Sequence, residues 1–260
     1  MVDNYPGFPD GVMGPQLMED MKKQAQRFGA EILSGYVDRV ELGEGPFRVY
    51  VDTQEFEAKT VIISTGSSAK LIGLENERRL MGHGVSTCAT CDGFFFRDKK
   101  IAVVGGGDSA MEESTFLTKF ASDVALIHRR NQFRASKIMQ DRALSNDKIR
   151  VLYNSVIEDV LGDDAVTGIR VRNLNDDATS DIDLDGVFIA IGHNPNTGIF
   201  KGQIDLDEQG YVVTTPGSTG TTVPGVFACG DVQDPVFKQA ITAAGSGCIA
   251  ALEAEKFIEG

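Results

Sequence analysis

The feature that most constrains the fold is a glycine-rich turn between an apolar strand and a helix. Residues 101–104 read Ile-Ala-Val-Val, residues 105–107 are three glycines, and residues 108–120 carry a helical pattern. A second apolar strand follows at residues 124–127. This order predicts a β–α–β unit with parallel strands, because a strand–helix–strand connection normally pairs its strands in parallel with a right-handed crossover.

The turn has the G-x-G-x-x-A spacing of a dinucleotide-binding loop. Gly105 permits the tight turn, Gly107 lets a pyrophosphate approach the backbone, and Ala110 lets the helix pack closely on the strand. The N-terminus of the following helix attracts the anion. We interpret the segment as a dinucleotide site, and the alternative is a glycine turn with a purely structural role.

The end of the second strand carries a basic cluster that indicates the cofactor. An NAD site usually has an acidic residue here to bind the ribose 2′-hydroxyl. This chain has His128, Arg129 and Arg130, with Arg134 shortly after. Because guanidinium forks bind phosphate oxygens, the pattern predicts NADPH with the three arginines around its 2′-phosphate. The alternative is a solvated basic loop.

Cys88 and Cys91 form a C-x-x-C pair, and the other two cysteines of the chain lie far from it. Structural zinc is disfavoured, since such sites normally need four ligands and the chain has no second pair. A redox dithiol is favoured over two incidental thiols, because this spacing permits a small disulfide. Asp92 follows directly, where its carboxyl can shuttle protons or serve ordinary turn chemistry before Gly93.

NADPH and a redox dithiol together predict a flavin, because hydride transfer must be joined to thiol–disulfide exchange. Candidate contacts are Gly230 and Asp231, whose carboxylate can reach ribityl or ribose hydroxyls, and Gln239 and Ala240 at the start of a Gly/Ala-rich helix. The alternative is a closely packed helix without a cofactor.

Charge and hydropathy exclude several classes of partner. The formal net charge is −13, which argues against nucleic acid and anionic membranes as main partners. No apolar run reaches the ~18 residues that a membrane helix needs. Because the first residues lack the basic and apolar segments of a signal peptide, we expect a cytoplasmic protein.

The rest of the chain predicts further elements. Residues 15–28 and 238–257 have helical patterns, and residues 67–84 resemble a linker. A turn is expected at residues 43–46. Strands are expected at residues 31–37, 47–51, 55–64, 149–153, 156–161, 166–172, 187–191 and within 223–231.

Together these motifs resemble the low-molecular-weight thioredoxin reductases, flavoproteins of the pyridine nucleotide–disulfide oxidoreductase type. Most of the chain matches in order and spacing. The matching stretches are Asn4 to Pro9, Thr65-Gly66, Cys88 to Gly93, Gly105 to Ala110, His128 to Arg130 with Phe133 to Ala135, Gly192 to Asn196, and Cys229 to Asp231 running on to Cys248.

The resemblance implies an α/β fold with two Rossmann-like, three-layer dinucleotide-binding domains. It places a discontinuous FAD domain at residues 1–72 and 200–260, and an NADPH domain with the C-x-x-C pair at residues 73–199. It implies FAD and NADPH as cofactors, a homodimer, and thioredoxin as the protein substrate. Family members rotate one domain against the other, and the hinges here would be near residues 67–84 and 192–203.

The resemblance also implies roles for individual residues. Cys91 would lie next to the flavin, Cys88 would attack thioredoxin, and Asp92 would be the acid–base group. The expected NADPH contacts are Gly105, Gly107, Asp108, Ser109, Ala110, His128, Arg129, Arg130, Arg134, Ile191 and Gly192. The expected FAD contacts are Asn4, Thr65, Gly66, Gly230, Asp231, Lys238, Gln239 and Ala240. No metal is expected.

The sequence departs from the family pattern in two places. Family members open with a β–α–β unit that carries the FAD pyrophosphate loop, and this chain begins after it, which predicts an N-terminally truncated FAD domain. Lys238 stands where the family usually has Arg, which keeps the positive charge but loses the forked guanidinium group.

Two alternative functions remain. One is a flavin-poor NADPH-binding remnant without turnover, and the other is the reductase of a peroxidase-linked disulfide carrier, whose dithiol commonly reads Cys-Pro-His-Cys. A flavin-dependent relative that receives its electrons from ferredoxin would lack the arginine cluster, so Arg129 and Arg130 argue against that function.

Overall fold

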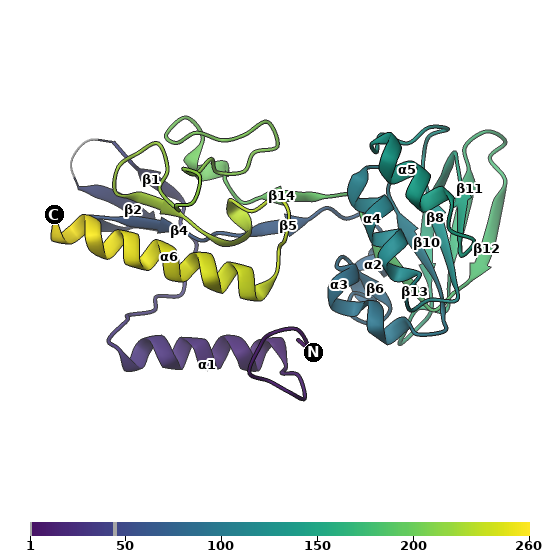
Figure 1. Ribbon diagram of the computed structural model, residues 1–260, viewed down its shortest axis with the longest axis horizontal. Helices are drawn as coiled ribbons and strands as arrows, with labels where there is room; N and C mark the ends of the chain where they lie inside the picture. The colour runs from purple at the N-terminus through teal and green to yellow at the C-terminus, as the bar shows by residue number, and fades with distance from the viewer. Residues whose placement is uncertain (1, 44–45) are drawn as a thin grey trace. The chain divides into compact units, whose positions relative to one another are not determined.

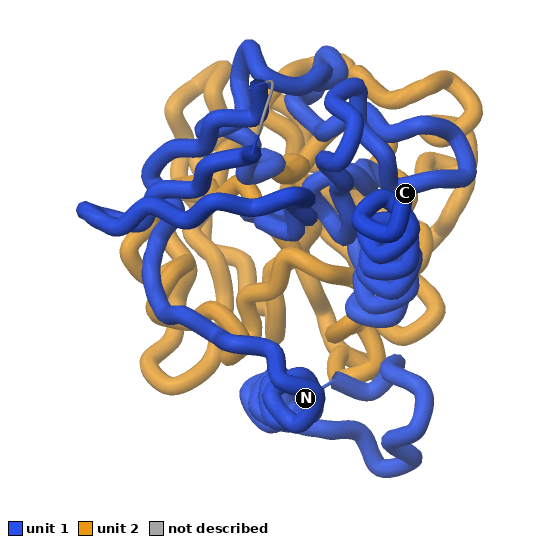
Figure 2. Tube along the Cα trace, turned by 90° about the vertical axis from the view of Figure 1, so that its left-hand side faces the viewer, with its two compact units in different colours: residues 1–68, 194–260 blue, residues 69–193 orange. Residues whose placement is uncertain are grey.

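The chain divides into two compact units. The computed structural model describes residues 2–43 and 46–260. Unit 1 is Met1–Ser68 with Asn194–Gly260, and unit 2 is Ala69–His193 (Figures 1 and 2). The boundaries expected from the sequence, after residues 72 and 199, lie slightly further along the chain. Which cofactor each unit binds stays a prediction.

Unit 2 is built on a five-stranded, wholly parallel sheet in the order β6-β13-β7-β8-β9. The strands are β6 (Val85–Ser86), β7 (Lys100–Val104), β8 (Asp123–Ile127), β9 (Ile149–Leu152) and β13 (Gly186–Ile189). The predicted β–α–β unit is confirmed: β7 and β8 pair in parallel, and helix α4 (Asp108–Leu117) connects them.

Three layers enclose the core of unit 2, as the resemblance implied for the fold. One face of the sheet carries α3 (Ala89–Asp92), η1 (Gly93–Phe96), α4 and α5 (Lys137–Leu144). The other face is covered by α2 (Glu75–Arg79) and by an antiparallel sheet of β10 (Ser155–Leu161), β11 (Gly168–Asn173) and β12 (Thr179–Asp183). Side chains alternate between the faces: Val103 and Leu126 pack toward α4, while Ala125 and Ile127 pack toward β10 and β11.

The segment predicted as a linker, residues 67–84, is structured instead. It contains β5 (Ser67–Ala69) and α2, and the helix is anchored by the fully buried carboxylate of Glu77. One carboxylate oxygen accepts the Ile72 N–H at 2.8 Å, and the other accepts those of Gly73 and Leu74 at 2.8 and 3.2 Å. Three backbone donors compensate the burial of the carboxylate, so this loop is held in one conformation.

Replacing this carboxylate tests its contribution to stability. Glu77→Gln keeps the shape but turns an amide NH₂ toward backbone donors, so at least one buried N–H loses its acceptor. We expect the free energy of unfolding in urea to fall by about 2–4 kcal/mol. Glu75→Gln, at an exposed position on the same helix, should change it by less than ~0.5 kcal/mol. Equal effects of the two substitutions would contradict the anchoring role.

Unit 1 also layers helix against sheet. Its elements are α1 (Gly14–Arg27), β1 (Arg39–Glu41), β2 (Phe47–Val51), β3 (Gln54–Ala58), β4 (Val61–Ile63), η2 (Gly198–Phe200), β15 (Val226–Ala228), η3 (Gly230–Val232) and α6 (Ala240–Glu259). Strands β1 to β3 form an antiparallel meander, and β4 pairs in parallel with β15. Val226 and Ala228 of β15 pack with the meander, while Phe227 and Cys229 pack with α6. In addition, β5 and β14 (His193–Pro195) form a two-stranded sheet.

Several predicted elements of unit 1 need correction. Residues 31–37 form no strand and are exposed, because no neighbouring strand supplies the hydrogen bonds that an extended segment needs. The strand expected at residues 55–64 is two strands, β3 and β4, separated by residues 59–60. The helix expected at residues 15–28 is present, but only its Leu17 is buried. The turn expected at residues 43–46 includes residues 44–45, which lie outside the described residues.

Candidate functional site

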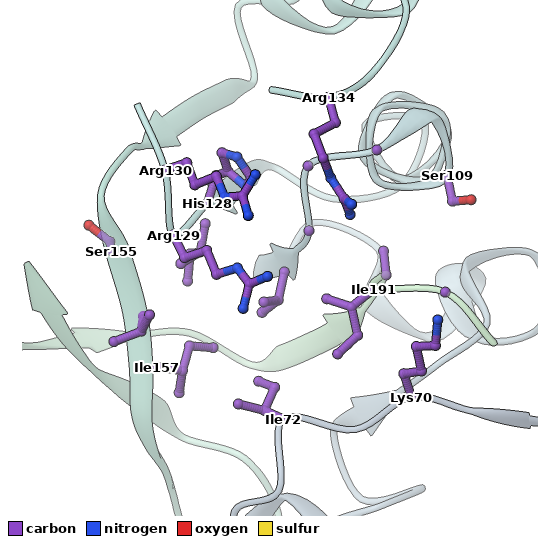
Figure 3. A pocket seen from close by; sticks show the side chains of 18 of the residues that line it. Lys70, Ile72, Ser109, His128, Arg129, Arg130, Arg134, Ser155, Ile157 and Ile191 are labelled. Atoms are coloured by element: carbon purple, nitrogen blue, oxygen red, sulfur yellow. The ribbon is translucent and has the colours of Figure 1, made fainter. Parts of the chain in front are cut away.

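Unit 2 holds a cavity of about 600 Å³ at the carboxyl ends of its parallel strands (Figure 3). Its walls include Val104 at the end of β7, Ile127 at the end of β8 and Ala190 just after β13. The volume falls within the range of small-molecule sites. Ligands of open α/β sheets bind at this edge, so the cavity is the candidate dinucleotide site.

The three glycines of the turn meet different neighbours. A Cβ on Gly105 would lie 2.4 Å from the carbonyl oxygen of Ala190 and 2.6 Å from Cβ of Ala110, so Gly105 permits the close packing. A Cβ on Gly107 would meet nothing within 4 Å, which leaves its backbone open to a ligand. A Cβ on Gly106 would lie 2.2 Å from the ring of His128, so this position also needs glycine.

His128 packs directly against the glycine turn at Gly106. Its ring is buried and packs against Phe133, with the two ring centroids 5.0 Å apart. Its Nε2–H donates to the carbonyl oxygen of Gln132 at 2.9 Å, which makes Nε2 the protonated ring nitrogen when the imidazole is neutral. The Gly106 carbonyl in turn accepts the Arg134 N–H at 2.8 Å. The basic loop is therefore folded onto the glycine turn.

Three exposed arginines give one side of the cavity its positive charge. Arg129, Arg130 and Arg134 all line it, and Figure 3 shows the side chains of Arg129 and Arg134 reaching toward the hollow from two sides. The N-terminus of α4 opens onto the same cavity through Gly107 and Ser109. Guanidinium groups and a helix N-terminus both attract phosphate, so the site has the chemistry of a phosphorylated dinucleotide pocket.

Most residues expected to contact NADPH line this cavity. They are Gly105, Gly107, Ser109, His128, Arg129, Arg130, Arg134, Ile191 and Gly192. Asp108 and Ala110 do not. The Asp108 carboxylate accepts the backbone N–H and the hydroxyl of Ser136 at 2.7 and 2.9 Å, which ties α4 to the start of α5. Ala110 is fully buried against the strand.

The cavity also has lining residues that the sequence did not predict, four of which are labelled in Figure 3. Lys70, Ile72, Ser155 and Ile157 line the wall away from the glycine turn (Figure 3). Lys70 and Ile72 belong to the segment taken for a linker, and Ser155 and Ile157 to an ordinary strand pattern. Only the charge of Lys70 in the predicted hinge was a signal. The Ile72 backbone is held by Glu77, so this wall is preorganised.

The substitutions Gly106→Ala and Gly107→Ala distinguish the contribution of the glycine turn to stability from its contribution to NADPH binding. Gly106→Ala forces its methyl group into the His128 ring, so we expect a loss of about 1–3 kcal/mol in unfolding free energy. Gly107→Ala leaves stability within ~1 kcal/mol, but its methyl group occupies the approach of a pyrophosphate and weakens NADPH binding. Urea denaturation and fluorescence titration with NADPH measure the two effects. A stable Gly106→Ala protein would refute the role of His128.

The C-x-x-C pair is a disulfide at the start of α3. Cys88 and Cys91 are joined, with their Cα atoms 5.3 Å apart. Cys88 is half-buried and Cys91 is exposed. The Asp92 carboxylate accepts a hydrogen bond from the Ser86 hydroxyl at 2.6 Å. In residues 2–43 and 46–260, no group of three or more His, Cys, Asp and Glu side chains is arranged to hold a metal ion.

The expected FAD contacts lie in unit 1, where parallel strands β4 and β15 end in glycine turns. Gly66 and Gly230 adopt φ values of +70° and +71°, a conformation that favours glycine. The Thr65 hydroxyl donates to the backbone carbonyl oxygen of Asn196 at 2.8 Å, and the Asn196 side-chain amide donates to that of Thr65 at 2.8 Å. Half-buried Asp231 has its pKa raised by burial, although nearby Lys238 opposes the shift.

The N-terminal segment contacts the start of α6 in unit 1. The Asn4 side-chain amide donates to Gln239 Oε1 at 2.8 Å, across 235 positions of sequence. Gln239 is the N-cap of α6, and Ala240 is its first residue. The Lys238 ammonium group lies 5.3 Å from the centroid of the Tyr211 ring. This set of a carboxylate, amides and a helix N-terminus fits the hydroxyl and phosphate groups of a flavin dinucleotide.

The two free cysteines differ in exposure, which predicts their order of alkylation. Cys229 is buried and burial raises its pKa, whereas Cys248 on α6 is exposed. A raised pKa leaves less thiolate at a given pH, and burial also blocks the reagent. With iodoacetamide at pH 8, mass spectrometry should detect modification of Cys248 at least about tenfold faster. Comparable rates would contradict this order.

Comparison with known proteins assigns the chain to a family. The sequence profile of the pyridine nucleotide-disulphide oxidoreductase family matches residues 3–247. This is the class of enzyme that the α/β fold, the glycine-turn cavity and the disulfide define. No helix among the described residues is long and apolar enough to cross a membrane.

Individual relatives narrow the class. The thioredoxin reductase of Rickettsia felis is 52% identical over 99% of this chain and 84% of its own length. That of Mycolicibacterium smegmatis is also 52% identical, over 99% and 83%. The crystal structure of thioredoxin reductase from Streptococcus pyogenes aligns with a TM-score of 0.93 at 40% identity, covering 99% of this chain and 84% of that one. The chain therefore belongs to the low-molecular-weight thioredoxin reductases, a family of NADPH-dependent flavoprotein oxidoreductases.

Proposed function

We propose that this chain uses NADPH to reduce the disulfide of a thioredoxin, with FAD as its bound cofactor and Cys88 and Cys91 as its redox pair. The observation that supports this most is the Cys88–Cys91 disulfide in the same unit as an arginine-lined glycine-turn cavity. The proposal includes a homodimer in the cytoplasm, as the family resemblance and the sequence suggest.

NADPH would bind along the cavity of unit 2. Its pyrophosphate would lie over Gly107 at the N-terminus of α4, where the backbone is open. Its 2′-phosphate would lie among Arg129, Arg130 and Arg134. Gly192 also lines the cavity and would line the nicotinamide half. The apolar residues of the lining, which include Ile72 and Ile157, would shield the bound cofactor from water.

The thiol chemistry balances two electrons and two protons. The Cys88 thiolate attacks one sulfur of the thioredoxin disulfide, which breaks that bond and forms a mixed disulfide. The Cys91 thiolate then attacks Cys88 Sγ, restores the Cys88–Cys91 bond and releases the second thiol of thioredoxin. Two thiols of this chain are oxidised, one disulfide of the partner is reduced, and each departing thiolate takes up a proton.

FAD, when bound, couples the two-electron hydride chemistry of NADPH to the one-disulfide chemistry of the cysteine pair. In unit 1, Asp231 would accept hydrogen bonds from its hydroxyls. The other residues that would hold it are Asn4, Thr65, Gly66, Gly230, Lys238, Gln239 and Ala240. Burial that raises the pKa of Asp231 indicates a carboxylate poorly supplied with water, which favours pairing with ligand hydroxyls.

The visible spectrum and a coupled assay test the proposal together. Protein purified with added FAD should show flavin absorption and should oxidise NADPH only when oxidised thioredoxin is present. NADPH binding without flavin absorption or turnover would instead identify a flavin-poor remnant. Turnover with a peroxidase-linked disulfide carrier but not with thioredoxin would identify the second alternative. Analytical ultracentrifugation tests the homodimer.

A further inference from the structure

Ser86 occupies a rigid position directly before the redox pair. It is the last residue of β6, where it pairs in parallel register with the fully buried Phe188 of β13. The Ser86 side chain is itself buried, with 5% relative exposure. The central sheet of unit 2 therefore fixes the place of its hydroxyl group, whereas Cys88 and Asp92 lie on a short helix outside the sheet.

The Ser86 hydroxyl joins the two ends of that helix. It donates to Asp92 Oδ2 at 2.6 Å and accepts the Cys88 N–H at 3.0 Å. A hydroxyl has one proton to donate, and the bond to a carboxylate is the stronger one because it is charge-assisted. The 3.4 Å contact of Ser86 Oγ with the Cys88 carbonyl oxygen is therefore secondary.

These contacts are not those of an ordinary helix cap. Cys88 is the N-cap of α3, and its own side chain makes no capping hydrogen bond. Ser86 lies two residues before the cap and directs its proton to the side chain of Asp92 instead of to a backbone acceptor. The contact therefore orients a carboxylate next to a disulfide.

We propose that Ser86 is the positioning residue of Asp92, an inference that rests on the proposed function. With Oδ2 held by Ser86, the other oxygen, Oδ1, exchanges protons with the redox pair. As Cys91 attacks the mixed disulfide, the Asp92 carboxylate takes the proton of the Cys91 thiol and passes it to the departing thiolate. The carboxylate is unchanged over the cycle, and no further oxidant or reductant is needed.

A flavin-independent exchange reaction tests this role. The full chain is reduced with dithiothreitol, freed of reductant under argon and mixed with a small disulfide. Acid quench and mass spectrometry follow formation of the Cys88–Cys91 bond. Glutathione disulfide releases an alkyl thiolate that needs a proton, whereas 5,5′-dithiobis(2-nitrobenzoate) releases an aryl thiolate that leaves as a stable anion.

Four variants make the comparison. Ser86→Ala removes the hydroxyl, Ser86→Thr retains it, and Asp92→Asn removes the carboxylate. Thr87→Ala removes a neighbouring hydroxyl as the matched control. We expect Ser86→Ala and Asp92→Asn to slow exchange with glutathione disulfide about tenfold or more, and exchange with the aryl disulfide about twofold or less. Ser86→Thr and Thr87→Ala should retain the rates of the unaltered chain.

The outcomes separate the inference from the proposed function. If Asp92→Asn slows exchange with glutathione disulfide and Ser86→Ala does not, the role of Ser86 is overturned and the acid–base role of Asp92 remains. If both variants exchange with glutathione disulfide at the rate of the unaltered chain, Asp92 has no acid–base role and the inference about Ser86 is wrong as well. Equal losses with the two disulfides would mean that Ser86 only supports the fold. NADPH affinity and thermal melting check folding, and Ser86→Gly repeats the test if the alanine variant melts early.

Discussion

Cys88→Ser and Cys91→Ser are each expected to abolish NADPH-driven reduction of thioredoxin, with a loss of at least ~10³-fold. One sulfur cannot both attack the partner and close the disulfide that releases it. The remaining thiols do not substitute, since Cys229 is buried and Cys248 has no second cysteine at C-x-x-C spacing. The measurement is NADPH oxidation at 340 nm by FAD-supplemented protein.

The same two variants assign the role of each sulfur. If Cys88 attacks thioredoxin, Cys91→Ser accumulates a mixed disulfide with it, because the resolving thiolate is gone. Cys88→Ser then traps no such complex. Non-reducing electrophoresis distinguishes the two results. Cys248→Ser serves as the control and should keep full activity. Undiminished turnover in either redox variant would remove the pair from the reaction.

Arg129→Ala is expected to weaken NADPH binding about 10–100-fold while changing NADH binding less than about twofold. In the proposed binding mode the Arg129 guanidinium group contacts only the 2′-phosphate, which NADH lacks. Because Arg129 is exposed, added salt should screen the interaction and narrow the difference between variant and parent. Calorimetric titration at two ionic strengths measures both effects.

Arg142→Ala provides a matched control for this experiment. Arg142 is an exposed arginine on α5 of the same unit and does not line the cavity. Its removal changes the net charge by the same amount, so it reports any long-range effect of charge alone. Equal loss of NADPH and NADH affinity in Arg129→Ala would show that the cluster does not distinguish the 2′-phosphate.

Local patterns account for the elements that were predicted correctly. The β7–α4–β8 unit carries its signal in adjacent residues: two wholly apolar strands, glycines between them, and a helical period. Residues 31–37 also include several apolar residues but form no strand, since a strand also needs a partner. The segment at residues 67–84 was taken for a linker because its key residue, Glu77, acts through a buried carboxylate that composition cannot distinguish from a solvated one.

The sequence by itself determined the class of this protein: the parallel unit, the spacing of its glycines, the arginines after the second strand and the C-x-x-C pair. Each of these depends on residues within one or two elements, where backbone geometry dictates the outcome. Only the tertiary structure decided that His128 packs against Gly106, and that the Ser86 hydroxyl donates a hydrogen bond to Asp92. The same holds for Asn4, which bonds Gln239 across 235 positions. Such contacts depend on how separate elements pack, and no spacing along the chain encodes that packing directly.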